Sequence, residues 1–197
     1  MNDKPFILLM YCSLLTGCSI SLTPVTSIGT AGSTTGYHSI RVMNVKDTTG
    51  VNAGFGYGAV SSYSGKSADI GAISIPDEIN GFWAKYNAEG NKFIAFYRIN
   101  NQIDNELAGL KINALRDFYK SFKTANTAMQ LIVDGPRVRL LYTMNCFSKL
   151  DDCTPRENAD PNGWVIRSPD NTTEVVVLFD GTGEASDTPF PGSPYDK

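Results

Sequence analysis

The sequence predicts an α+β fold, with a mainly antiparallel β-sheet or sandwich and one principal helix. Three observations lead to this class. Short runs of β-branched and aromatic residues recur along the chain between turn residues, two pairs of these runs are joined by connections typical of hairpins, and only one segment has apolar residues at helical spacing.

The first strands are expected at residues 37–45 and 70–75, which are short apolar runs bounded by turn residues. Between them, residues 54–58 alternate glycine with aromatic residues, a pattern typical of a strand with one glycine-lined face. A phosphate-cradling loop is the alternative interpretation. Such a loop needs a helix behind it, and the sequence predicts none there.

Two β-hairpins are expected in the middle of the chain. Residues 83–86 and 93–99 flank the turn residues 87–91, which include Gly90, and residues 129–133 and 138–144 flank the turn 134–137. Two further strands, at 164–167 and 174–179, lie on either side of the turn residues 168–171.

One helix is predicted from about residue 104 to residue 123, because apolar side chains recur there at intervals of three and four residues. These side chains belong to Ile103, Leu107, Leu110, Ala114, Leu115, Phe118 and Phe122. Gly109 lies inside the pattern and is expected to bend or break the helix.

The length of 197 residues fits one domain with tails. Residues 18–36 are rich in serine, threonine and glycine and are expected to form a flexible tether. Residues 37–180 are expected to form a single α+β domain. Residues 181–197 are rich in glycine and proline and are expected to form a loosely packed tail.

Charge gives no indication of a nucleic-acid partner, since the formal net charge is −3 and the chain has no run of lysine or arginine. No calcium loop, phosphate loop or cofactor fingerprint is present, so neither a cofactor nor a metal is expected.

Candidate catalytic residues are few. His38 is the only histidine and lies beside no nucleophile-elbow sequence, so it is interpreted as an ordinary strand residue. The strand ending at Asp180 superficially suggests a phosphatase, but that chemistry needs a second aspartate where Leu178 stands. Asp180 is therefore interpreted as a turn residue.

Two adjacent carboxylate pairs, Asp77-Glu78 and Asp151-Asp152, are expected in loops, and nothing in their spacing places two acids across a cleft. The chain is therefore not expected to be an enzyme, and no catalytic residue is predicted. A carboxylate-dependent hydrolase is kept as the second alternative function.

The first seventeen residues have the pattern of a signal peptide: a polar start with Lys4, an apolar run at 6–15 that is too short to span a bilayer, and small residues. The sequence Leu15-Thr16-Gly17-Cys18 resembles the lipobox of bacterial lipoproteins. The resemblance implies cleavage before Cys18 and lipidation of that cysteine by a diacylglyceryl group, with acyl chains such as palmitate. Several acyl chains hold a protein stably on a membrane.

Export bears on the remaining cysteines. Cys12 would leave with the signal peptide and Cys18 would carry the lipid, so Cys146 and Cys153 remain in a compartment that oxidises thiols. A disulfide between them is predicted, which would make residues 147–152 a rigid protrusion. A metal pair is the alternative, but it lacks further ligands, since His38 lies far away in the sequence.

The order of motifs along the chain resembles that of a family of small lipoproteins encoded beside type VI secretion phospholipase effectors. The lipoproteins of this family are the immunity proteins of those effectors. The resemblance rests on the lipobox, a 37–45 strand with a glycine-rich continuation, Ile75-Pro76 before Gly81-Phe82-Trp83, a hairpin into Tyr97, and a helix followed by the turn 134–138. No functional residue of the family can be transferred to this chain.

The resemblance implies a lipoprotein of the outer membrane that faces the periplasm, because Ser19 rather than aspartate follows the lipidated cysteine. It also implies binding of a secreted lipase effector by covering its active site or its membrane-docking surface. Candidate contacts are the 147–152 loop, Trp83 and Trp164, although Trp83 is expected in the core. A structural or assembly lipoprotein of the cell envelope is the first alternative.

Overall fold

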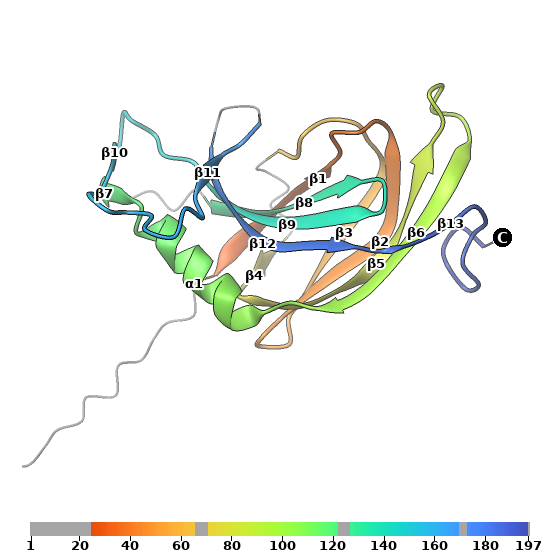
Figure 1. The fold of residues 1–197 in the computed structure, drawn as a ribbon, viewed down its shortest axis with the longest axis horizontal. Helices are drawn as coiled ribbons and strands as arrows, with labels where there is room; N and C mark the ends of the chain where they lie inside the picture. The colour runs from red at the N-terminus through yellow and green to blue at the C-terminus, as the bar shows by residue number, and fades with distance from the viewer. Residues whose placement is uncertain (1–24, 66–70, 122–126, 170–172, 197) are drawn as a thin grey trace, which may run out of the picture.

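The computed structural model describes residues 25–65, 71–121, 127–169 and 173–196 (Figure 1). Within these ranges two large β-sheets pack face to face, and one helix lies at the end of the sandwich, which confirms the predicted α+β class. All strand pairs are antiparallel except one, the pairing of β1 with β8.

The strands are given in their spatial order. The six-stranded sheet contains β11 (Ile166–Arg167), β12 (Glu174–Thr182), β9 (Arg137–Met144), β8 (Thr127–Asp134), β1 (Thr26–Gly32) and β4 (Ala72–Ile73). The five-stranded sheet contains β13 (Glu184–Ser186), β6 (Phe93–Gln102), β5 (Pro76–Tyr86), β2 (His38–Asp47) and β3 (Asn52–Val60). A separate two-stranded sheet pairs β10 (Asp152–Pro155) with β7 (Tyr119–Ser121).

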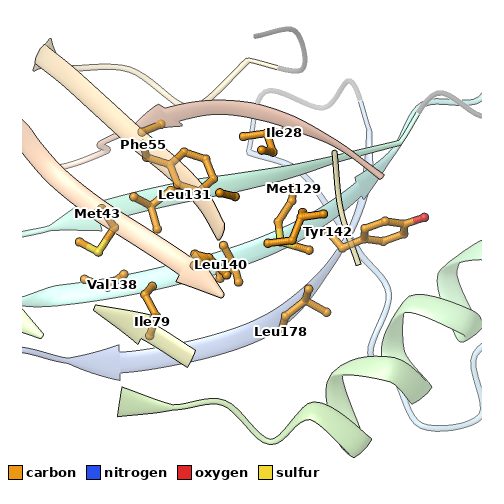
Figure 2. Packing of buried hydrophobic residues seen from close by; sticks show 14 of the residues in the cluster. Ile28, Met43, Phe55, Ile79, Met129, Leu131, Val138, Leu140, Tyr142 and Leu178 are labelled. Carbon is orange, nitrogen blue, oxygen red and sulfur yellow. The ribbon is translucent and has the colours of Figure 1, made fainter. Parts of the chain in front are cut away.

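The hydrophobic core lies between the two large sheets (Figure 2). Met43 and Ile79 from the five-stranded sheet, and Leu131 and Leu140 from the six-stranded sheet, are fully buried. They alternate along their strands with residues of the outer faces, as expected for sheets that each cover one side of a core. Burial of each such side chain stabilises the fold by about 1.5–3 kcal/mol.

Both predicted hairpins are present, as β5 with β6 and β8 with β9. The glycine-rich segment forms β3, as predicted, with Ala53 and Phe55 buried and Gly54 and Gly56 exposed. Of the strand expected at 70–75, only Ala72–Ile73 pairs as β4, while residue 70 lies outside the described residues.

The helix α1 (Asn105–Arg116) begins where predicted, because the Asp104 side chain accepts a hydrogen bond from the Leu107 backbone N–H at 2.9 Å. It runs through Gly109 without a break. A Cβ atom at Gly109 would lie only 3.1 Å from Ile75 Cδ1, so the glycine allows close packing. The predicted extension to residue 123 is wrong, since Tyr119–Ser121 forms β7, and strand pairing with β10 overrides the helical periodicity.

The predicted tether at 18–36 is wrong for its second half. Thr26–Gly32 is β1, an inner strand of the six-stranded sheet, and Ile28 contributes to the core. A Cβ atom at Gly32 would lie 2.4 Å from the Ser62 carbonyl oxygen. The small residues are thus required by close backbone packing, although their composition is also typical of a flexible linker.

The predicted loose tail at 181–197 is also wrong. β12 continues to Thr182, and the chain then passes to the other sheet, where β13 pairs with β6. The crossing needs Gly183, because a Cβ atom there would lie 2.5 Å from both the Arg98 carbonyl oxygen and the Trp83 ring. Beyond β13, the Tyr195 hydroxyl donates to the Ser39 carbonyl oxygen at 2.8 Å.

Candidate functional site: the disulfide-closed loop

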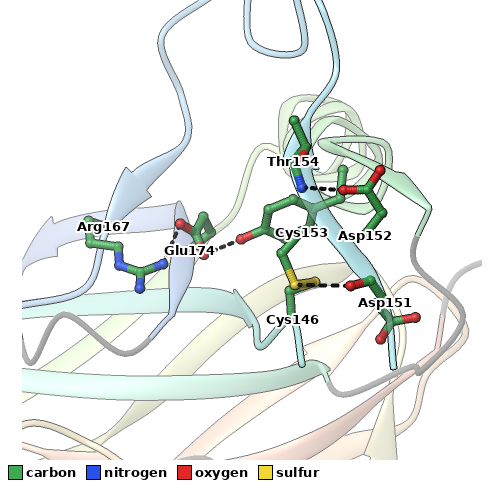
Figure 3. The surroundings of a disulfide bond; sticks show 8 residues. Cys146, Asp151, Asp152, Cys153, Thr154, Arg167 and Glu174 are labelled. Carbon is green, nitrogen blue, oxygen red and sulfur yellow. Dashed lines mark hydrogen bonds and ion pairs between the residues drawn. A yellow bond between two sulfur atoms is a disulfide. The ribbon is translucent and has the colours of Figure 1, made fainter. Parts of the chain in front are cut away.

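The candidate site is the loop between β9 and β10, which we call the disulfide loop and define as residues 146–153. Cys146 and Cys153 are joined by a disulfide, with their Cα atoms 5.8 Å apart, which confirms the predicted bond (Figure 3). The backbone N–H groups of Leu150 and Asp151 donate to the Phe147 carbonyl oxygen at 2.8 and 2.9 Å. Covalent closure and these two bonds give the loop a compact turn.

The base of the disulfide loop is fixed to the rest of the molecule. Beyond β10, the Arg156 backbone N–H donates to the Phe118 carbonyl oxygen at 2.9 Å, and its guanidinium donates to the Tyr119 carbonyl oxygen at 2.8 Å. The Tyr119 hydroxyl donates to the Glu174 carboxylate at 2.5 Å, and Arg167 pairs with the same carboxylate (Figure 3). The loop therefore has a support in the six-stranded sheet.

Tyr119 acts as a permanent hydrogen-bond donor in this support. Burial of the phenol, together with its hydrogen bond to Glu174, raises the pKa of Tyr119 well above its usual value. The hydroxyl consequently keeps its proton at any physiological pH.

The disulfide loop exposes two apolar side chains, Phe147 and Leu150, on either side of the exposed polar residues Ser148 and Lys149. Phe147 is 40% exposed and Leu150 is 69% exposed, although side chains of this size are normally buried. A shallow depression of about 520 Å³ is lined by Cys146, Phe147, Ser148, Lys149 and Leu150. Exposed apolar side chains on a loop of fixed conformation are typical of residues that bind a partner protein.

The charged residues of the loop do not form an acid–base pair. Asp151 is largely buried, whereas Asp152 is exposed, and hydrogen bonds from Thr154 lower the pKa of Asp152. The second predicted pair is also divided, because Asp77 accepts from Asn105 and Glu78 accepts from Asn80. Neither pair places two carboxyl groups across a cleft, as glycoside hydrolysis would need.

His38 is a strand residue, as predicted, because it is the first residue of β2, but it also lies in a buried polar cluster that sequence reasoning missed. Its Nδ1 is 3.0 Å from Ser33 Oγ, and Ser33 Oγ donates to Asp134 Oδ1 at 3.2 Å. His38 Nε2 accepts from the Gly135 backbone N–H at 3.1 Å. Although serine, histidine and aspartate meet here, the serine lies between the other two.

This order does not suit nucleophilic catalysis, in which histidine lies between the nucleophile and the aspartate. His38 and Ser33 are fully buried, and His38 Nε2 is occupied by a backbone donor. The cluster instead joins the β8–β9 turn to residues 33–38. No sequence signal identified it, because its members are separated by about a hundred residues.

The other predicted site residues are placed as follows. Trp83 is fully buried, as predicted, and Trp164 is partly buried against the core. Cys18 lies outside the described residues. In the described ranges no three His, Cys, Asp or Glu side chains are grouped to hold a metal ion, and no helix there is long and apolar enough to cross a membrane.

Comparison with protein-family models, with curated proteins and with solved structures finds no match to this chain.

Proposed function

We propose that this chain is a lipid-anchored immunity protein of the periplasm that binds and inhibits a type VI secretion lipase effector. The observation that carries the binding role is the disulfide loop, with Phe147 and Leu150 exposed on a closed turn. The lipobox-like sequence ending at Cys18 and the Cys146–Cys153 disulfide support export, since structural disulfides are stable in oxidising compartments.

Two exposed apolar side chains can contribute to binding. Covering Leu150, which is 69% exposed, would contribute about 1–2 kcal/mol, and covering the 40% of Phe147 that is exposed would contribute about 1 kcal/mol. Such residues dominate binding when they fill pockets. Because the loop is closed covalently and fixed at its base, little conformational entropy is lost on binding. A preorganised loop that exposes Phe147 and Leu150 therefore suits the apolar substrate groove of a lipase.

Membrane anchoring supports inhibition of an enzyme that acts on lipid. A lipid on Cys18 would confine the protein to the surface on which the lipase works, and this raises its effective concentration near the target. Covering either the active site or the membrane-docking surface of the lipase would then prevent access to phospholipid. Inhibition by occlusion needs no catalytic group in this chain.

The test is to co-express the full chain with the product of the neighbouring gene, directed to the periplasm, and to measure cell survival and co-purification. We expect survival and a stable complex with the unmodified chain. Leu150→Ala, and more strongly Phe147→Ala with Leu150→Ala, should weaken the complex by about tenfold or more. The matched control is Leu110→Ala, because Leu110 is 59% exposed on α1, outside the loop.

Equal losses for Leu110→Ala and Leu150→Ala would refute the loop as the contact. Absence of both rescue and complex with the unmodified chain would remove the immunity proposal. Co-purification of a resident envelope-assembly protein would instead support a structural or assembly lipoprotein.

A further inference from the structure

A row of asparagines crosses the outer face of the five-stranded sheet. Asn44 on β2 is paired in register with Asn80 on β5, and Asn80 is paired with Asn100 on β6. Asn44 and Asn80 each lie between buried residues of the same strand, so their side chains point away from the core. The row belongs neither to the core nor to the disulfide loop.

The surface is hollowed along this row. A depression of about 550 Å³ covers β5, β6 and the crossing at Gly183, with Asn80, Phe82 and Asn100 in its lining. A second depression of about 300 Å³ lies at Asn44 and β3, where Gly54 and Gly56 have no side chain to fill it. We call the two together the amide groove, which runs across the strands.

Hydrogen bonds orient two of the three amide groups of the row. Asn44 Nδ2 donates to Asn80 Oδ1 at 3.4 Å, and Asn80 Nδ2 donates to Glu78 Oε1 at 3.2 Å. Asn100 makes no side-chain hydrogen bond to any residue in the described ranges. The row thus presents several donors and acceptors, because each amide group has two N–H donors and one carbonyl acceptor, and hydrogen bonds hold the amides of Asn44 and Asn80 in place.

Charge restricts the class of ligand. Arg98 at the wall is paired with Glu184 at 2.7 Å, and its guanidinium lies 4.7 Å from the centre of the Phe190 ring. Glu78 in the first depression and Arg41 in the second are of opposite charge, so the formal charges of the groove balance and favour neither an anion nor a cation. A metal ion also lacks support, since the described ranges hold no group of three possible ligands.

We propose that the amide groove binds a neutral oligosaccharide laid across the strands. Hydroxyl and acetamido groups of sugars match fixed side-chain donors and acceptors, and Phe82 supplies apolar surface for a sugar ring. An extended peptide fits less well, because peptides that bind sheets use the backbone groups of an edge strand. The central asparagine lies on β5, which has a neighbouring strand on both sides.

The proposal is tested by isothermal titration calorimetry of the full purified chain with two neutral trisaccharides, triacetylchitotriose and maltotriose. The detergent should carry no sugar headgroup. We expect saturable binding of at least one trisaccharide, weakened by about tenfold in Asn80→Ala and in Asn100→Ala. Asn162→Ala is the matched control, because Asn162 is exposed and does not line the groove.

Asn100 is exposed, so its replacement leaves the fold unchanged, and thermal unfolding verifies this for each variant. Absence of binding by both trisaccharides would overturn the proposal, as would binding that Asn80→Ala and Asn100→Ala leave unchanged. Binding of an uncharged Gly-Ser peptide, lost in Asn80→Ala while neither sugar binds, would assign the groove to peptide instead.

Discussion

The backbone N–H of Gly135 donates to Nε2 of His38 at 3.1 Å, and this bond links the β8–β9 turn to the five-stranded sheet. The carbonyl oxygen of the same glycine accepts from Trp83 Nε1 at 2.7 Å. Both polar backbone groups of one turn residue are therefore satisfied by side chains of the opposite sheet. Breaking either bond would leave a buried polar group unpaired, at a cost of about 1–3 kcal/mol.

The His38 bond predicts that stability falls in mild acid. Nε2 accepts a hydrogen bond, so the proton of the neutral ring is on Nδ1, and a second proton on Nε2 would face the Gly135 N–H. Burial lowers the pKa of His38, and Lys85 lowers it further, while Gly36 and Asp134 oppose the shift. The pKa is therefore lower in the folded than in the unfolded state, where it is about 6.5.

The stabilisation is then fully present above about pH 6.5 and is lost as the pH falls towards the folded-state pKa. Urea unfolding at a series of pH values should show this loss in the unmodified chain. His38→Gln should be less stable at neutral pH and should lack that part of the pH dependence. Parallel profiles for the two proteins would contradict the assignment.

Removal of the disulfide by Cys146→Ser with Cys153→Ser is expected to lower the free energy of unfolding by about 2–3 kcal/mol. The reason is that the bond restricts the unfolded chain between two residues seven apart. Urea unfolding measures the change. Reductant should produce a similar loss in the unmodified chain and none in the double variant, and an effect of reductant on the double variant would refute this explanation.

Gly32→Ala is expected to destabilise the protein by about 1–3 kcal/mol, because the added Cβ would lie 2.4 Å from the Ser62 carbonyl oxygen. The matched control is Gly58→Ala, since nothing lies within 4 Å of a Cβ at Gly58. That variant should be unchanged or more stable by about 0.5 kcal/mol. The measurement is the thermal unfolding temperature of the two variants under the same conditions. Equal stabilities of Gly32→Ala and Gly58→Ala would disprove tight packing of β1.

Deletion of residues 187–197 is expected to lower the free energy of unfolding by roughly 2–5 kcal/mol. The segment supplies Phe190, whose ring centre is 6.5 Å from that of Phe82, and Tyr195, whose ring packs against Phe93 and Phe96. Tyr195→Phe removes only the bond to Ser39 and should cost about 1 kcal/mol. A deletion without effect on urea unfolding would mean that the segment behaves as a loose tail.

Local patterns predicted the elements whose formation depends on neighbouring residues. The two hairpins, the glycine-lined strand β3 and the start of α1 at Asp104 follow from alternation, turn residues and a capping side chain. Local patterns did not predict where α1 ends, because Tyr119 pairs with β10, a strand about 35 residues further along the chain. The apolar residues keep their helical spacing through Phe118, although the helix has already ended before that residue.

The candidate site was predicted only in part. The expectation of export, together with the positions of Cys146 and Cys153, predicted the disulfide and a rigid loop, but not which loop residues would be exposed. The asparagines of the amide groove are unremarkable along the chain, since Asn44, Asn80 and Asn100 are widely separated there. Strand register alone brings them together.

The sequence by itself determined the fold class, the hairpins and the disulfide, because each depends on local spacing or on the chemistry of one residue type. Only the tertiary structure showed that the two glycine-rich ends contain strands, β1 near the N-terminal end and β13 near the C-terminal end. Glycine is required both where a chain must be flexible and where two backbones pack closely, and composition does not distinguish the two. At Gly32 and Gly183 the distances to neighbouring backbone atoms decide in favour of packing.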